Sequence, residues 1–235
     1  MFCGSADAFT YNLVDDWSNL NNPNGPWSYN EGNNPLPYNV DNWPATEFGI
    51  SQTAWAYTSS GADYHFLPGW FKSIGDPNLL STNPFHSNYD WLEGDVVVHT
   101  TDGEINGIAN VTWKNPMAGI YDVNGGIWIG RENNKSEDWN LYLNDVLLAS
   151  GKVFAGDSFS RSNPNSFNIQ GINISEGSML KLELFKTLGS DGGDFVGVNL
   201  NIDSNSTPTN AVPEPATILL LGIGLTGVLV RKYRV

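Results

Sequence analysis

Carboxylates are the side chains through which this chain could perform catalysis. Two acids about 5–9.5 Å apart can hydrolyse a glycosidic bond, one of them protonating the leaving group. The acids that lie close together in the middle of the sequence are Asp90, Glu93, Asp95 and Glu104. The chain holds 25 Asp and Glu residues, so such groups also arise by chance. We therefore expect no catalytic residues, and a secreted polysaccharide-active enzyme with paired carboxylates is the alternative.

Histidine and cysteine add no recognisable chemistry to these acids. The three histidines are scattered along the sequence, without the spacing of a metal-binding motif: His65, His86 and His99. The single cysteine, Cys3, permits neither an intrachain disulfide nor a Cys-rich zinc site. The sequence also contains no Gly-x-Ser-x-Gly elbow and no P-loop, so neither a serine hydrolase nor an NTPase is indicated.

Acidic loops are the candidates for binding calcium, which prefers carboxylate and carbonyl oxygens. The best of them is the turn Asp191-Gly192-Gly193-Asp194, in which Asp191 and Asp194 would be the ligands. A solvated acidic turn has the same sequence, and no EF-hand pattern is present. No cofactor other than this structural calcium is expected.

Aromatic residues in loops are the candidates for binding carbohydrate, because a flat ring can lie against the apolar face of a sugar. Six of them lie in turn-rich, Asn-rich sequence: Trp17, Trp27, Tyr29, Trp43, Trp70 and Trp91. Burial in a core is the commoner fate of such a residue. Trp113 and Trp128 lie within alternating segments, and we expect both in the core.

The composition points to a folded β protein that must position these residues. Its 29 Asn, 25 Gly and 13 Pro disfavour long helices, whereas 12% aromatic and 40% hydrophobic residues exclude a disordered chain. The formal net charge of −14 argues against nucleic-acid binding.

Short strands separated by turn residues make up the body of the chain. In its first half they are expected at 27–30, 48–58 and 64–67. From Gly94 the pattern is regular, with strands expected at 94–100, 108–113, 126–130, 166–174, 179–185 and 195–202. A hairpin is expected at 139–149, with Asn144-Asp145 as its turn. The roughly seven strands from Gly94 onward, with turn signals about every 8–12 residues, favour an all-β, antiparallel β-sandwich ectodomain over residues 9–203.

The C-terminal residues form a tail of three parts. Val212, Pro213, Glu214 and Pro215 precede the uncharged apolar run 216–230, and Arg231, Lys232 and Arg234 follow it. As a helix this run is about 22 Å long, at about 1.5 Å per residue, so snorkelling basic residues must help it to span a membrane. The positive-inside rule places the basic cluster in the cytoplasm and the preceding residues outside. Residues 204–211 form a flexible stalk before the tail.

This tail resembles the PEP-CTERM sorting signal, also named the VPEP or ice-binding-protein C-terminal domain. The resemblance covers residues 212 to about 234, roughly a tenth of the chain. It implies that an exosortase, a membrane-embedded protease-transpeptidase, cuts near the Pro-Glu-Pro motif. The chain would then be anchored in the inner membrane by its C-terminal helix before processing, and would reach the cell surface or extracellular matrix afterwards. Ala6-Asp7-Ala8 has the small-x-small form of a signal-peptidase site, so residues 1–8 are expected to be the remnant of an export signal.

The body resembles non-catalytic jelly-roll sandwiches of secreted bacterial proteins. The resemblance rests on the turn from Trp113 through Pro116 and Gly119 to Tyr121, on Leu143-Asn144-Asp145, and on the segments 174–180 and 193–200. It implies a jelly-roll-like fold, and several members of that group bind carbohydrate or a structural calcium.

Taken together, these features predict a non-catalytic, exported surface protein. Its expected partners are an exosortase, the inner membrane before processing and extracellular polysaccharide, as part of an exopolysaccharide or biofilm matrix. A purely structural matrix protein with no small ligand is a further alternative.

Overall fold

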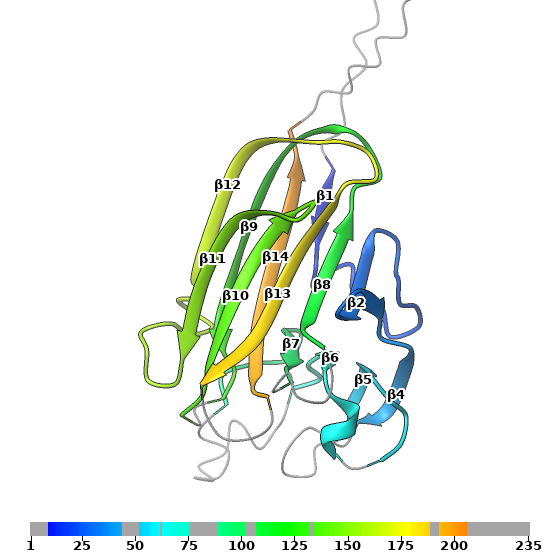
Figure 1. Ribbon diagram of the computed structural model, residues 1–235, viewed down its shortest axis with the longest axis vertical. Helices are drawn as coiled ribbons and strands as arrows, with labels where there is room; N and C mark the ends of the chain where they lie inside the picture. Colours follow the sequence, from blue (N-terminus) through cyan, green and yellow to red (C-terminus); the bar gives the residue numbers. More distant parts are fainter. Residues whose placement is uncertain are drawn as a thin grey trace, which may run out of the picture. The chain divides into compact units, whose positions relative to one another are not determined.

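The computed structural model describes residues 9–43, 52–61, 63–75, 89–101, 107–131, 134–188 and 193–205. These residues form two antiparallel β-sheets that pack face to face, as Figure 1 shows. The all-β antiparallel sandwich is therefore confirmed.

The first sheet, sheet A, has eight strands. Seven of them follow one another in the order β12 (Asn165–Ile174), β9 (Gly119–Ile129), β14 (Phe195–Ser204), β7 (Val96–His99), β6 (Gly69–Lys72), β5 (Gln52–Ala56) and β4 (Tyr38–Trp43). The eighth strand, β1 (Thr10–Asn12), pairs with the second half of β14, on the edge where β7 pairs with the first half. β14 therefore pairs with β9 along one edge, and with β7 and then β1 along the other.

The second sheet, sheet B, has six strands and carries the site described below. Their order is β11 (Val146–Phe154), β10 (Ser136–Leu143), β13 (Met179–Leu188), β8 (Ala109–Lys114), β2 (Trp27–Glu31) and β3 (Asn34–Pro35). A short 3-10 helix, η2 (Asp63–Phe66), precedes β6.

Strand alternation divides sheet B into an apolar face and a polar face. In β8, Val111 and Trp113 are fully buried against sheet A, whereas Thr112 and Lys114 point the other way. The space between the sheets is filled largely by aromatic rings: Trp27, Tyr29, Trp70, Trp113, Tyr121 and Trp139. Burial of such large apolar surfaces is the main stabilising contribution to a sandwich.

A second, smaller core lies on the other face of sheet A. In β7, Val96 and Val98 belong to the main core, whereas Val97 packs with an aromatic cluster on the opposite side. That cluster includes Trp43, Phe71, Trp91 and Phe195. Trp91 contacts Phe195 with ring centroids 5.0 Å apart. Both faces of this part of sheet A are therefore covered.

Individual strands were predicted with mixed success. The hairpin of β10 and β11 is confirmed, and Asn144 and Asp145 adopt the positive φ angles, 47° and 68°, that its turn requires. The strand expected at 64–67 is wrong, because these residues form η2 and the segment that follows it. The strand expected at 126–130 begins earlier, at Gly119, since inward residues alternate with outward Asp122 and Asn124 from there onward.

Candidate functional site: a polar groove on sheet B

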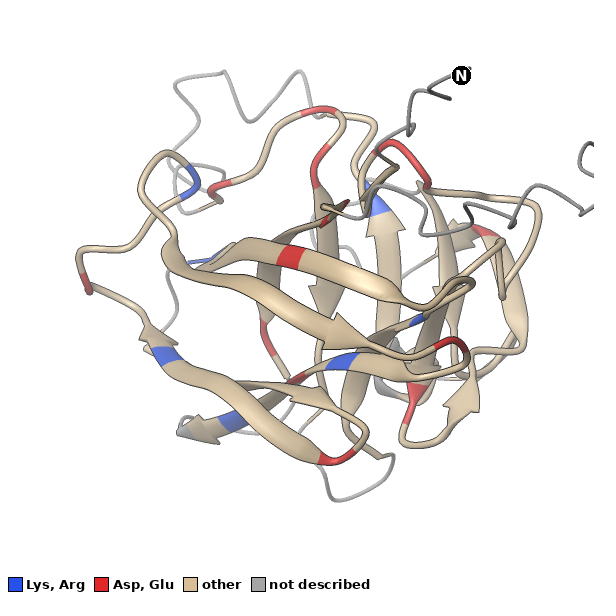
Figure 2. Cartoon of the chain, turned by 90° about the horizontal axis from the view of Figure 1, so that it is seen from above, with Lys and Arg blue, Asp and Glu red and all other residues tan. Residues whose placement is uncertain are grey.

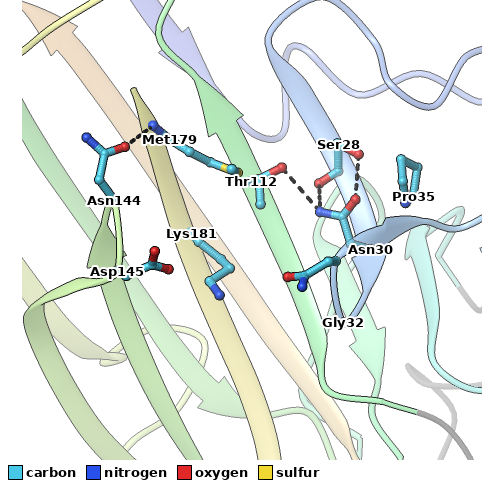
Figure 3. A pocket seen from close by; sticks show the side chains of 10 residues that line it. Ser28, Asn30, Gly32, Pro35, Thr112, Asn144, Asp145, Met179 and Lys181 are labelled. Carbon is cyan, nitrogen blue, oxygen red and sulfur yellow. Dashed lines mark hydrogen bonds between the residues drawn. The ribbon is translucent and has the colours of Figure 1, made fainter. Parts of the chain in front are cut away.

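A groove of about 390 Å³ crosses the outer face of sheet B. It is lined by residues of β2, the β2–β3 hairpin, β8, β13 and the β10–β11 turn: Ser28, Asn30, Gly32, Asn33, Pro35, Thr112, Asn144, Asp145, Met179 and Lys181. Figure 3 shows the Lys181 side chain in the middle, with the β10–β11 turn on one side and β2 with its hairpin on the other. Seven of these ten residues are polar or charged, which sets this surface apart from the core behind it.

The floor of the groove is a network of side-chain amides and hydroxyls centred on Asn30. The Asn30 Nδ2 atom donates hydrogen bonds to the Ser28 carbonyl at 3.0 Å, to Asn110 Oδ1 at 3.0 Å and to Thr112 Oγ1 at 3.2 Å. Its Oδ1 atom accepts a hydrogen bond of 2.6 Å from the Ser28 hydroxyl. The neighbouring Asn110 Nδ2 donates to the Gly32 carbonyl at 2.7 Å. Because so many bonds converge on Asn30, its amide has one orientation, and the floor is fixed before any ligand arrives.

This network is buried although it lies on the outer face of its sheet. Asn30 is 4% exposed and Asn110 is fully covered. The cover comes from the β2–β3 hairpin, where Gly32 has a φ of +55° that lets the chain reverse. Polar side chains are buried only where their hydrogen bonds are satisfied, and here the strand pairing Asn30–Asn110 supplies those bonds.

Lys181 lines the groove, and it contacts a carboxylate and an aromatic ring that are not themselves lining residues. Lys181 Nζ lies 2.7 Å from Glu183 Oε1, and it lies 5.5 Å from the centroid of the Tyr142 ring. Tyr142 of β10 pairs directly with Lys181 of β13, so the ring and the ammonium group share the outer face. Tyr142 is half-buried and leaves part of its ring in solvent.

The opposite wall of the groove is built by the β10–β11 turn. Asn144 Oδ1 accepts a hydrogen bond from the Met179 backbone N–H at 2.8 Å, and its Nδ2 donates to Ser178 Oγ at 3.0 Å. These bonds fix the turn against the start of β13. The Met179 side chain remains 46% exposed and gives this wall an apolar surface.

The six aromatic residues predicted to contact a glycan lie elsewhere. Five of them are in the two cores and at most 8% exposed: Trp27, Tyr29, Trp43, Trp70 and Trp91. Trp17 is half-buried and packs on Tyr29, with ring centroids 4.4 Å apart. That prediction is wrong for the five buried rings, because four of them lie on strands and point into a core, whereas Trp91 packs against Phe195. Trp113 and Trp128 are buried as predicted.

Arg161 forms hydrogen bonds with two acids of the alternative, enzymatic interpretation, Asp90 and Asp95. Its Nε and Nη2 atoms donate to Asp95 Oδ2 at 2.5 Å and to Asp95 Oδ1 at 3.0 Å. Its backbone N–H donates to Asp90 Oδ2 at 2.6 Å. Both carboxylates therefore hold the β11–β12 connection against the segment before β7. Glu93 lies in the turn between Asp90 and Asp95, and Glu104 is outside the described residues.

The predicted calcium ligands are only partly described. Asp191 lies outside the described residues, and Asp194 is buried, with Oδ1 accepting the Phe195 backbone N–H at 2.8 Å. The nearby carbonyl of Gly193 accepts a hydrogen bond of 2.6 Å from Lys135 Nζ, so the chain itself places a cation there. Within the described residues no three His, Cys, Asp or Glu side chains gather as a metal site.

Glu137 is a buried acid that we did not predict from the sequence. Its Oε1 atom accepts a hydrogen bond from the Thr100 hydroxyl at 2.8 Å. Burial raises the pKa of Glu137 well above its usual range, and the neighbouring Asp194 adds to this effect. The Glu137 carboxyl is therefore held in its neutral form more readily than an exposed one.

Comparison with known proteins adds information about the C-terminal tail. Residues 211–234 match the PEP-CTERM protein-sorting motif. The match agrees with the tail predicted from Val212–Pro215 and the basic end. No curated protein matches the chain. The predicted membrane span 216–230 lies outside the described residues, and within them no helix has the length and apolar character needed to cross a membrane.

The solved structures that match parts of this chain include several carbohydrate-binding domains. One is the C-terminal family 6 module of the laminarinase LamC from Zobellia galactanivorans, at 13% identity and a TM-score of 0.28 over 46% of this chain and 78% of that one. A family 35 module from Clostridium thermocellum has 16% identity and a TM-score of 0.29 over 57% and 88%. The N-terminal cellulose-binding domain of Cellulomonas fimi β-1,4-glucanase C has 12% identity and a TM-score of 0.33 over 83% and 95%. Scores this low carry no argument about the ligand of this chain.

Proposed function

We propose that this chain is an exported, non-catalytic surface protein that binds polysaccharide through the groove on sheet B. An exosortase would recognise its PEP-CTERM tail at the inner membrane and release it to the cell surface or the extracellular matrix. The match of residues 211–234 supports the sorting step. The chemistry of the groove supports the binding step and is independent of the tail.

The observation that carries the binding proposal is the fixed polar floor beside an accessible ring. Sugars present hydroxyl groups, which both donate and accept hydrogen bonds, and an apolar ring face. The groove offers the Thr112 hydroxyl and the Lys181 ammonium group, held over the buried Asn30 network. The exposed Met179 side chain in its wall and the Tyr142 ring beside Lys181 add apolar surface. Pockets that combine apolar surface with a few fixed polar groups are the usual form of small-ligand sites.

Binding without catalysis fits the charged residues of this surface. Glycoside hydrolysis needs two carboxyl groups that flank the bond to be cut. Among the described residues that line the groove, the charged ones are Lys181 and Asp145. Asp90, Glu93 and Asp95 of the enzymatic alternative are not among the lining residues, and Asp90 and Asp95 are engaged with Arg161. We therefore propose that the groove holds a polysaccharide without cleaving it.

The binding proposal is tested by removing the accessible ring. Tyr142→Ala should weaken binding to a matrix polysaccharide about tenfold, because truncating a central contact of an interface costs more than about 1 kcal/mol. Tyr57→Ala is the matched control, since Tyr57 is 40% exposed and follows β5 of sheet A, whereas Tyr142 lies beside Lys181 on sheet B. Equal binding by both variants and the parent chain would exclude the groove. Release of reducing sugar ends by the parent chain would instead support the hydrolase alternative.

The sorting proposal is tested separately in the native host. The intact mass of the mature protein should correspond to a chain that ends near Val212–Pro215, recovered from the surface or the medium. A full-length chain that stays in the inner membrane would contradict sorting by an exosortase.

A further inference from the structure

The cation in the groove is already neutralised by a carboxylate of the same strand. Lys181 and Glu183 form an ion pair of 2.7 Å, and their side chains are only 21% and 17% exposed. An ion pair that is partly withdrawn from water keeps more of its mutual attraction than one in bulk solvent. The Lys181 ammonium group is therefore committed to Glu183 and to the Tyr142 ring rather than to an incoming anion.

Two other lysines on this face of sheet B share their surroundings with a carboxylate. Lys152 of β11 lies 3.6 Å from Asp138 of β10. Lys114, at the end of β8, lines a neighbouring hollow together with Glu176. The wall of the groove adds the carboxylate of Asp145. This face therefore has no excess of positive charge.

The rest of the protein reinforces this balance. The chain has 25 acidic and 11 basic residues and a formal net charge of −14. Figure 2 shows Lys and Arg positions that are few and dispersed among Asp and Glu positions. The negative electrostatic potential of the protein repels polyanions before they reach the groove.

We infer that the groove selects uncharged polysaccharide and rejects acidic polysaccharide. The inference rests on the proposed polysaccharide binding and specifies its ligand class. An acidic sugar would bring a carboxylate or sulfate into a groove whose cation is already paired, and that anion would lose water without gaining a partner. A neutral sugar would place its hydroxyl groups against the Lys181–Glu183 pair, which supplies donors and acceptors side by side. Glu183 is then the residue that determines specificity.

Matched polymers test this inference on the full chain. In native affinity electrophoresis, neutral gels would contain hydroxyethyl cellulose, dextran, galactomannan or xylan, and acidic gels would contain carboxymethyl cellulose or alginate. We expect at least one neutral polymer to retard the chain and the acidic polymers to leave its migration unchanged. Retardation by the neutral polymer should persist at high salt, because no charge pairs form across the interface.

Glu183→Gln tests the role of the ion pair directly. The substitution keeps the size of the side chain and frees Lys181, so binding to carboxymethyl cellulose should strengthen about fivefold, as expected for one additional exposed charge pair. Asp138→Asn is the matched control, because it removes a carboxylate from the same face that pairs with Lys152 rather than with Lys181, and it should leave carboxymethyl cellulose binding unchanged. A melting curve shows whether Glu183→Gln is folded. Lys181→Gln provides a second variant, in which rejection of acidic polymers should persist.

Each outcome decides between the two proposals. Stronger retardation of the parent chain by acidic than by neutral polymers, abolished by Lys181→Gln, would overturn the inference and keep polysaccharide binding. A folded Glu183→Gln variant that gains no affinity for carboxymethyl cellulose would overturn the role of the ion pair. Retardation by none of the polymers would overturn the binding proposal itself and the inference with it.

Discussion

The amide network under the groove makes Asn30→Asp a sharp test of the structure. The substitution preserves shape but replaces the Nδ2 donor with an acceptor. The Ser28 carbonyl and Asn110 Oδ1, both now 3.0 Å from a donor, would face a carboxylate oxygen. The Thr112 hydroxyl can rotate and donate to the new oxygen, so two bonds are lost. Each buried acceptor left without a donor costs about 1–3 kcal/mol.

The two losses together lower the free energy of unfolding by about 4 kcal/mol. For a domain of this size the melting temperature falls by about 2–4 °C per kcal/mol, so we expect a decrease of about 12 °C at neutral pH. Burial would raise the pKa of the introduced carboxyl above the unfolded value of about 3.9. A raised pKa in the folded state makes the variant lose stability as the pH rises through that pKa. Its defect should therefore shrink toward pH 4, where the protonated acid regains a donor.

Thermal unfolding followed by circular dichroism at neutral and acidic pH measures both effects. Asn33→Asp is the matched control, because Asn33 is exposed in the β2–β3 turn and the same chemical change there should shift stability by about 0.5 kcal/mol or less. If Asn30→Asp melted like Asn33→Asp at neutral pH, the buried network would not exist as described.

Three further substitutions test other parts of the account. Glu137→Gln should be more stable than the parent chain at high pH, because the raised pKa of Glu137 in the folded state lowers the free energy of unfolding of the parent as the pH increases above about 4.3. This loss amounts to up to about 1.4 kcal/mol per pH unit. Urea titrations across pH measure it, and a constant difference in stability between the two proteins would contradict it. Gly197→Ala should destabilise the chain by about 1–3 kcal/mol, because the added Cβ would overlap the buried Trp128 ring. An unchanged melting temperature would show that the Trp128 ring does not pack against Gly197. Arg161→Lys should lower the free energy of unfolding by about 1 kcal/mol, because lysine cannot reproduce the two hydrogen bonds to Asp95. Denaturant unfolding measures the change. A variant as stable as the parent would show that these two hydrogen bonds contribute nothing to stability.

The fold was largely predictable from local sequence patterns. Alternation in 108–113 and 179–185 identifies β8 and β13, and Asn144-Asp145 identifies the β10–β11 hairpin. The tail was also predictable, because its three parts are contiguous in the sequence. Local patterns were insufficient where tertiary packing decides the outcome, as at 64–67, which forms a 3-10 helix rather than a strand.

The candidate site could not be predicted in the same way. Asn30, Thr112 and Lys181 come from three strands that are distant in sequence, and only the strand order β13–β8–β2 brings them together. The sequence instead indicated that aromatic residues in turn-rich segments contact a glycan, but Trp27 and Trp70 lie in the core. The polar positions that alternate with apolar ones in β8 and β13 were the available signal. They show which residues face outward, but they do not show that the β2–β3 hairpin covers them and forms a groove.

Hydrogen–deuterium exchange with and without a bound neutral polysaccharide locates the surface that binds it. We expect slower exchange in residues 28–35, 110–114, 142–146 and 179–183, which form the floor and walls of the groove and the strands beside it. The outer face of sheet A, along β9, β12 and β14, should exchange at the same rate in both states. Protection of that face, with no change along the groove, would contradict the claim that the chain binds polysaccharide on sheet B.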